Sequence, residues 1–230
     1  MSLEKCQNIK KMYLDIGSNQ IGTEGINKLG TCLENCLNAE YISLHLDWNK
    51  LGSEGALTIV NSLVKCQNIS TLKLNLGNNK IGDQGTSALG RGLARCSKLS
   101  NLTLCLYNNV IGDEGASSLI LFLTRIPRLS SFAFVLSDNN IGQEGQQYIG
   151  NSLQKCQKMT SLIYDLSQMD RIPEVISILG KCLRKSESII FLNFNLIQLY
   201  NYTYDNVRVM DKIHNLKKMK RLILLQLYSN

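Results

Sequence analysis

LTLCLYNNVIGDEG, residues 102–115, is the stretch that decides the fold of this chain. Its first part alternates leucine with other residues, as a strand with one buried face does. A polar turn and the motif Ile-Gly-x-x-Gly follow, and then apolar residues at helical spacing, at Leu119, Leu123 and Ile126. The period of the apolar residues changes from two to about 3.6, which predicts a strand, a turn and a helix.

The same pattern recurs along the chain at one fixed interval, with no insertion or deletion between copies. An asparagine stands two residues before each copy of the motif. A fixed period of this length is the signature of a solenoid. We predict strands that start near residues 12, 42, 72, 102, 132, 162, 192 and 222, which makes seven to eight repeats of about 30 residues. The motif begins at Ile21, Leu51, Ile81, Ile111 and Ile141, after Asn19, Asn49, Asn79, Asn109 and Asn139.

The unit L-x-L-x-x-N-x-I-G-x-x-G, followed by a helix, resembles the leucine-rich repeat of the ribonuclease-inhibitor-like class. The resemblance covers essentially the whole chain. It implies an α/β solenoid, a curved horseshoe with parallel strands on its concave face and helices on its convex face. The unit is about two residues longer than that class usually has. In this it is similar to the regular arrays of protist leucine-rich-repeat proteins, some of which belong to ciliary or other large assemblies.

We predict a single leucine-rich-repeat domain over residues 1–230, with regular units in 12–161 and degenerate units in 162–230. Each unit of such a stack buries its apolar face against its neighbours. Gly25 and its equivalents are expected where a helix approaches the neighbouring unit closely. The asparagines are expected to turn inward and satisfy backbone groups where the strands end. One buried column is predicted along the helices, at Leu33, Leu63, Leu93, Leu123, Leu153 and Leu183.

The composition excludes several classes of protein. The chain is 44% hydrophobic and 19% charged, which is too apolar for a disordered protein. No run reaches the ~18–20 apolar residues of a membrane-spanning helix, and the first residues lack the apolar core of a secretory signal. With two histidines and none of the common catalytic motifs, we expect no enzymatic activity, no cofactor and no membrane association.

Eight cysteines invite a disulfide or metal interpretation, and their position argues against both. Five of them share one position of the unit, and Ile126 fills that position in another unit. A position that accepts isoleucine is a core position, where unpaired cysteine acts as a small hydrophobe. Unpaired thiols favour a reducing compartment, and we expect the cytoplasm. The resemblance implies a cilium or the cytoskeleton as the alternative. The column consists of Cys6, Cys36, Cys66, Cys96 and Cys156.

The net charge of +7 is unevenly placed along each unit. Acidic residues gather where helices are expected to begin and basic residues where they end, which complements the helix dipole. Thr23, Ser53, Asp83 and Asp113 are predicted N-caps. Two explanations are open for the basic residues. They serve helix electrostatics alone, or they form a surface for nucleic acid or an acidic protein. This predicted basic rim holds Lys5, Lys65, Arg95, Lys98, Arg125, Arg128, Lys155, Lys158, Lys185 and Lys218.

Residues between the strand leucines are expected to face solvent on the concave side, because side chains alternate along a strand. In the N-terminal half several of them are aromatic anchors of the kind enriched at protein interfaces. In the C-terminal half an apolar strip includes Ala133, and exposed apolar area often marks an interaction site. Ser43 and Asn193 are expected on the same face. The predicted partner-binding residues are Tyr13, His45, Trp48, Tyr107, Val135 and Ile163; for Trp48, simple packing over the strand-end turn is the alternative.

We therefore predict a non-enzymatic scaffold that binds a protein partner through the concave sheet. Two alternatives stay open: a structural subunit of a large assembly, such as a ciliary or axonemal one, and a nucleic-acid-associated protein that uses the basic rim. The chain opens on residues 2–9, which match the helix end at 62–69, and stops on an apolar strand. We expect it to be part of a larger complex or of a longer chain.

Overall fold

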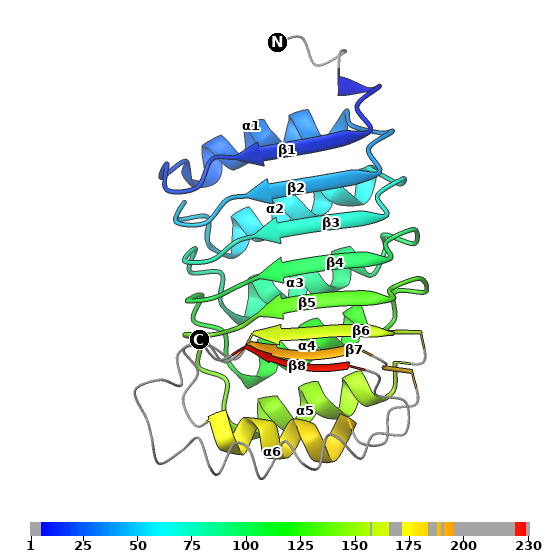
Figure 1. Cartoon of the computed structure of the whole chain (residues 1–230). Helices are drawn as coiled ribbons and strands as arrows, with labels where there is room; N and C mark the ends of the chain where they lie inside the picture. The colour runs from blue at the N-terminus through cyan, green and yellow to red at the C-terminus, as the bar shows by residue number, and fades with distance from the viewer. Residues whose placement is uncertain are drawn as a thin grey trace.

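The computed structural model describes residues 6–156, 158–165, 172–183, 188–189, 191–195 and 224–228. These residues form two layers, a sheet and a stack of helices (Figure 1). Eight strands make one parallel sheet in sequence order, and six described helices lie on one side of it. The opposite side, here called the open sheet face, has no described helix over it and corresponds to the predicted concave face.

The elements follow the predicted alternation. The strands are β1 (Lys11–Asp15), β2 (Tyr41–His45), β3 (Thr71–Asn75), β4 (Asn101–Cys105), β5 (Ser131–Val135), β6 (Ser161–Asp165), β7 (Phe191–Asn195) and β8 (Leu224–Tyr228). The helices are α1 (Gly22–Glu34), α2 (Gly52–Lys65), α3 (Gly82–Leu93), α4 (Asp113–Leu123), α5 (Gln143–Gln154) and α6 (Ile172–Leu183). The helix predicted between β7 and β8 falls outside the described residues.

The fixed register holds from β1 to β7 and breaks at the last step. Leu72 pairs with Leu102, and every pair up to β7 keeps this offset. Leu192 instead pairs with Leu225, where the fixed interval would bring Leu222. The predicted start of the last strand near residue 222 is therefore wrong, because three extra residues enter before β8. The predicted seven to eight repeats are also too many, since the described residues hold six strand–helix units.

The predicted helix column forms the core. Leu33, Leu63, Leu93, Leu123, Leu153 and Leu183 are each 0–1% exposed. The cysteine column is buried beside it, and the thiol of Cys66 donates to the backbone oxygen of Leu33 at 3.1 Å. The glycine prediction holds in the later units, where a Cβ on Gly115 would lie 2.7 Å from the Cα of Asp83 in the preceding unit. It is wrong for Gly25, whose Cβ would meet only Ile21 of its own unit. These columns let neighbouring units supply each other's core.

The asparagines turn inward as predicted and tie three units together. Asn79 is fully buried, and its Oδ1 accepts from the N–H of Asn49 at 2.9 Å and of Leu51 at 3.3 Å. Its Nδ2 donates to the carbonyl oxygens of Leu46 at 2.9 Å and Leu76 at 3.0 Å. One amide thus satisfies backbone groups of the preceding unit and of its own unit. The next asparagine along accepts the N–H of Asn79 in turn.

The predicted N-caps are wrong. None of the helices α1, α2, α3, α4 and α5 has a side-chain capping hydrogen bond at its start. The residues that precede these helices are Ile21, Leu51, Ile81, Gly112 and Gly142. Asp83 instead reaches the next unit, where its Oδ1 accepts from the N–H of Gly112 at 2.6 Å. Asp113 does the same for Gly142 at 2.6 Å. Each carboxylate thus lies within its own helix and bonds the start of the neighbouring helix instead of its own.

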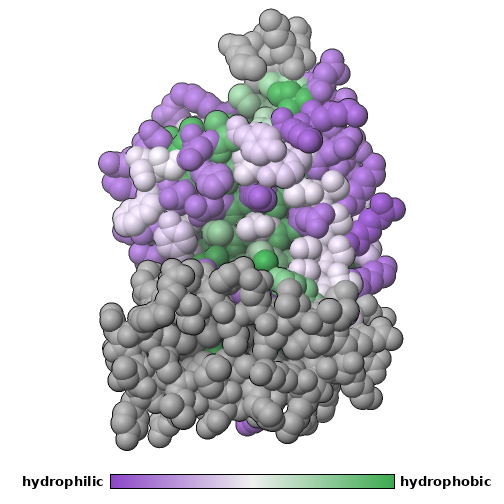
Figure 2. Space-filling model, in the orientation of Figure 1, coloured by the Kyte–Doolittle hydropathy of each residue, from purple (hydrophilic) through white to green (hydrophobic). Residues whose placement is uncertain are grey.

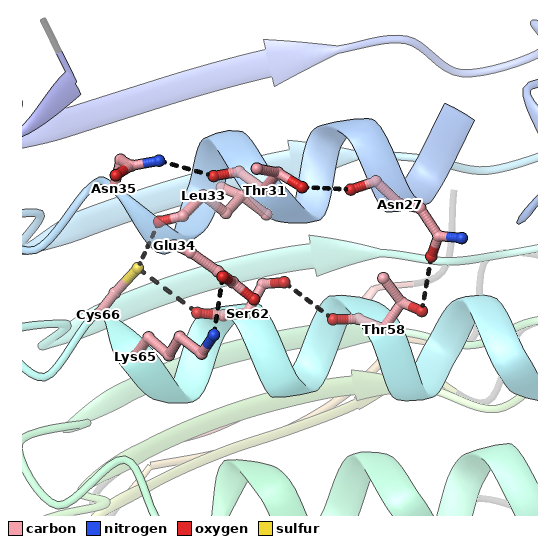
Figure 3. A network of polar contacts seen from close by, with 9 residues as sticks. All are labelled: Asn27, Thr31, Leu33, Glu34, Asn35, Thr58, Ser62, Lys65 and Cys66. Carbon is pink, nitrogen blue, oxygen red and sulfur yellow. Dashed lines mark hydrogen bonds and ion pairs between the residues drawn. The ribbon is translucent and has the colours of Figure 1, made fainter. Parts of the chain in front are cut away.

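Side chains also join successive helices, as Figure 3 shows for α1 and α2. The hydroxyl of Thr58 donates to Asn27 Oδ1 at 3.1 Å near the start of the pair. Lys65 forms an ion pair with Glu34 at 2.7 Å near its end. Because both ends of the pair carry such contacts, the two helices are held at a fixed offset.

Candidate functional site

Four side chains from three successive units meet at the carboxyl end of the strands. Asp47 lies at the centre of this group, called the strand-end cluster, with Trp48, Asn75 and Tyr107. Asp47 Oδ1 accepts from Asn75 Nδ2 at 3.0 Å, and its Oδ2 accepts from the Tyr107 hydroxyl at 3.4 Å. Trp48 is 53% exposed, so about half of its surface is open to solvent and the rest is covered by the protein. The cluster presents one exposed and one half-buried aromatic ring around a carboxylate.

The cluster depends on a missing side chain. Gly77 occupies the position of β3's unit that Asp47 and Tyr107 occupy in theirs. A Cβ on Gly77 would lie 2.1 Å from Cε1 of Tyr107, so the tyrosine ring occupies the space over the glycine. Only a glycine lets the ring cross this unit and reach Asp47, two units earlier in the chain.

The environment of the Tyr107 hydroxyl is unfavourable for its ionisation. Burial, and after it the negative charge of Asp47, raise the pKa of Tyr107 above its ordinary value, while a hydrogen bond from the Trp48 side chain acts in the opposite direction. The tyrosine therefore stays protonated at neutral pH and is available as a donor to Asp47. Trp48, Tyr107 and Asp47 therefore form one polar network.

The two other N-terminal candidates lie on neighbouring strands. Tyr13 is 67% exposed, and its ring packs against Tyr41 with 4.8 Å between the ring centres. His45 is exposed at the end of β2 and is in register with Asp15 on one side and Asn75 on the other. His45 is thus one strand away from a member of the cluster. Tyr13 lies two strands from Asn75 and is further from the cluster than His45.

The predicted apolar strip runs across the middle of the open sheet face. Ala133 is in register with Thr103 on one side and Ile163 on the other, and Val135 is in register with Cys105 and Asp165. Ala133, Val135 and Ile163 are all half-buried. Figure 2 shows hydrophobic residues along the middle of this face, with hydrophilic residues toward both ends of the strands. The strip and the cluster lie on the same side of the sheet, and β4, whose unit contributes Tyr107 to the cluster, pairs with the first strand of the strip, β5.

Two residues expected to face solvent are buried instead. Ser43 is 5% exposed and Asn193 is 6% exposed. Tyr13 and Lys73 lie in register on either side of Ser43, so the small side chain lies between two long ones. Asn193 lies in the same way between Ile163 and Gln226. Both predictions of solvent exposure are wrong because they treated each strand without its neighbours.

The thiol on the open sheet face is not activated. Burial first, and then the charges of Asp165 and Asp47, raise the pKa of Cys105 to about 11. Since the thiolate is the nucleophile, Cys105 is a poor candidate for covalent chemistry at neutral pH. Within the part of the chain that the structure describes, no three His, Cys, Asp or Glu side chains are arranged to hold a metal ion, and no helix is long and apolar enough to cross a membrane.

The basic rim is a second surface. Its seven described members, Lys65, Arg95, Lys98, Arg125, Arg128, Lys155 and Lys158, are all exposed. Lys5, Lys185 and Lys218 fall outside the described residues. Part of the rim is used within the stack, because Lys98 donates to Asn68 at 2.6 Å and Lys158 donates to the carbonyl of Pro127 at 2.9 Å. These contacts give the two lysines a structural role between successive units.

A pocket of about 220 Å³ opens at this rim, between the segments that follow α4 and α5. Its lining combines the cations Arg125, Lys155 and Lys158 with buried apolar side chains such as Ile126 and Met159. A pocket of this kind has the chemistry for a small anionic group. The sequence predicted the cations and could not predict the pocket, which depends on the path of two loops.

Repeated strand–helix units with a common core define a solenoid repeat protein. Residues 12–30, 42–60, 68–90 and 99–119 match the family model of the leucine-rich repeat. These residues are leucine-rich repeats, and the strand–helix units of the structure form the α/β solenoid of such repeats. Its assignment to the ribonuclease-inhibitor-like class stays a prediction. No curated protein matches the chain.

Two solved structures are similar to it in part. One is the C-terminal domain of tropomodulin from Caenorhabditis elegans, with 16% identity, a TM-score of 0.46, and coverage of 69% of this chain and 93% of that one. The other is actin-binding site 2 of leiomodin-1, with 14% identity, a TM-score of 0.43, and coverage of 80% and 84%. Since both TM-scores are below 0.5, neither similarity bears on what this chain binds.

Proposed function

We propose that this chain is a non-enzymatic interaction scaffold that binds a partner protein through its open sheet face. The observation that carries the proposal is the exposed aromatic ring of Trp48 within a cluster on the same side of the sheet as an apolar strip. Aromatic anchors beside apolar area are the features that dominate binding energy in protein interfaces. Tyr13, His45, Trp48, Tyr107, Val135 and Ile163 are the proposed contact residues.

Site-specific photo-crosslinking tests which face binds. A benzophenone amino acid replaces exposed Lys73 on the open sheet face or, as a matched control, exposed Asn61 on α2. In a lysate of the source organism, the proposal expects one discrete adduct from position 73 that mass spectrometry identifies, and none from position 61. Trp48→Ala combined with the probe at position 73 should remove that adduct. An adduct from position 61 alone would overturn the proposal.

The basic rim supports a second candidate function, binding of nucleic acid or an acidic protein. The specific observation is the pocket lined by Arg125, Lys155 and Lys158. Binding through phosphate contacts weakens steeply as salt rises. A labelled oligonucleotide titrated at low and physiological salt tests it, with the triple alanine variant at these positions as the control. Loss of binding in that variant alone would make the rim the better candidate.

The proposal also places the protein in a reducing compartment, the cytoplasm. All eight cysteines are unpaired, and most are buried. A buried unpaired thiol persists where the surroundings keep it reduced. Imaging of a tagged full-length chain tests the compartment, and accumulation in a secretory organelle would contradict it.

A further inference from the structure

Trp48 is the only tryptophan of the chain, and its backbone is in an unusual conformation. Its φ of 58° lies in the left-handed region, where non-glycine residues other than asparagine and aspartate are uncommon. The equivalent residues Ser18, Asn78, Asn108 and Asp138 have a similar φ and shorter polar side chains. The left-handed φ therefore belongs to the repeated turn, and what distinguishes Trp48 is the large ring, 53% exposed, that it carries there.

Negative charge lies next to this ring without a described counter-ion. A Cβ on Gly17 would lie 3.0 Å from Asp47 Oδ1 and 3.5 Å from Asp15 Oδ1, so both carboxylates border the space that the glycine leaves open. Neither forms an ion pair within 4.0 Å with any described lysine, arginine or histidine. Two lysines of the neighbouring units are otherwise placed: Lys50 donates to Gln20, and Lys73 lies two strands from Asp15. His45 is in register with Asp15 and forms no ion pair with it. The ion pairs of the described residues join Lys10 to Glu40, Lys28 to Glu24 and Lys65 to Glu34, so an aspartate outside an ion pair is common here. What sets Asp15 and Asp47 apart is that both lie beside one glycine.

The hydrogen bonds of Asp47 leave capacity for another donor. A carboxylate offers about four lone-pair sites, and the bonds from Asn75 and Tyr107 use two of them. These two bonds also fix the carboxylate in place, which lowers the entropic cost of binding. The remaining sites lie beside an exposed indole, so a ligand is offered charge and an aromatic face together.

We propose that the strand-end cluster, with Asp15, binds an arginine side chain of the partner protein; this inference rests on the proposed function. A guanidinium stacks on aromatic faces and donates two parallel hydrogen bonds to a carboxylate. Both features are offered here by Trp48 and Asp47. A lysine ammonium is a more strongly hydrated point charge and matches this flat arrangement less well. The described residues hold no third ligand that would make a metal ion the occupant.

The single tryptophan makes the test direct, because its indole N–H gives one NMR signal. The probe is the blocked peptide acetyl-Gly-Gly-Arg-Gly-Gly-amide, and the control peptide has citrulline, which is neutral and similar in shape, in place of arginine. We expect a saturable shift of the indole signal with the arginine peptide and at least a roughly tenfold weaker response with citrulline. Equal shifts with both peptides would overturn the inference.

Matched variants separate this site from general charge. Asp47→Asn should weaken binding of the arginine peptide by roughly tenfold, because the substitution removes the fixed charge and keeps the side-chain shape. Asp138→Asn, at an exposed aspartate three units further along, makes the same change in net charge and should have no effect. Asp15→Asn, at an exposed residue, should also weaken binding and serves if Asp47→Asn does not fold. Equal losses at positions 47 and 138 would contradict the site.

Failure of this inference and failure of the proposed function give different results. If the photo-adduct from position 73 persists while the arginine peptide leaves the indole signal unmoved, the inference is wrong and the scaffold function stands. If the adduct is absent and the peptide also fails, both are wrong. A lysine peptide that shifts the signal more than the arginine peptide would overturn the choice of arginine.

Discussion

The carboxylate of Asp83 accepts a 2.6 Å hydrogen bond from the N–H of Gly112, the residue that precedes the next helix. In the first three units the equivalent glycine N–H donates instead to a backbone carbonyl of the following unit, as Gly82 does to Asn109 at 2.8 Å. The units before those glycines carry no aspartate at this position; Thr23 and Ser53 stand there. One side chain therefore decides whether a helix start is held by the unit before it or the unit after it.

Asp83→Ala should lower the free energy of unfolding by about 1.5–3 kcal/mol, because it leaves a backbone N–H without a charged acceptor. Denaturant melts measure the loss. Gln84→Ala, at the exposed next residue, is the control and should stay within about 0.5 kcal/mol of the parent. Equal effects at both positions would mean that the Asp83–Gly112 bond contributes nothing specific.

Leu93→Ala should destabilise the protein by about 2–5 kcal/mol, because a fully buried side chain is shortened and leaves a cavity. Leu57→Ala makes the same chemical change at a residue that is 45% exposed, and it should cost less than about 1 kcal/mol. Urea melts of the two variants provide the comparison. A loss at Leu93 no larger than that of an ordinary surface substitution, about 0.5 kcal/mol, would sink the assignment of the core column.

The features that repeat were predictable from the sequence, because a fixed period presents the same physical demand several times. The leucine column, the inward asparagines and the buried position shared by Cys66 and Ile126 follow from it. Each of these features occurs in several units, so one irregular residue did not change the prediction. The strand alternation likewise predicted which residues share the open sheet face.

The features that occur once were not predictable in the same way. The place of Tyr107 over Gly77 depends on a contact across two units, and its signal in the sequence is a glycine where the neighbouring units have Asp47 and Tyr107. The destination of the Asp83 carboxylate depends on the distance between helices. The shift of β8 depends on extra residues in a segment that has lost the repeat pattern, so no periodic signal marked it.

The buried thiols should make stability fall in alkaline solution. Burial raises the pKa of Cys66 from 9.0 to about 12 and of Cys96 to about 11. Between pH 9 and 11 the unfolded chain therefore binds fewer protons than the folded one, so the free energy of unfolding falls as pH rises, by at most about 1.4 kcal/mol per pH unit for each thiol. Below pH 9 the thiols contribute no slope.

Urea melts at pH 8 and pH 10.5 test this on Cys66→Val, which should lose less stability between the two pH values than the parent. Ile126→Val changes the same position of another unit without a thiol and should keep the parent's profile. The pKa of the buried Tyr164 is raised too, and it contributes a fall common to all three proteins. Identical profiles for Cys66→Val and the parent would contradict the prediction.

Gly77→Ala should disrupt the strand-end cluster without removing any of its side chains. The new methyl group would overlap Tyr107, whose Cε1 would lie 2.1 Å away, so the ring must leave its place beside Asp47. We expect a shifted indole signal from Trp48 and a weaker response to the arginine peptide, by roughly tenfold. Tyr107→Ala should have an effect of similar size, because both changes remove the same contact.

The double variant decides whether the glycine acts through the tyrosine. If Gly77 matters because it seats the ring, adding Gly77→Ala to Tyr107→Ala should produce little further loss, since no ring remains to be displaced. The effects of two independent positions would instead add. Peptide titrations of both single variants and the double variant, followed at the Trp48 indole, give the coupling between the two residues. Additive losses would show that Tyr107 does not depend on the space over Gly77, and the account of how this cluster is built would then be wrong.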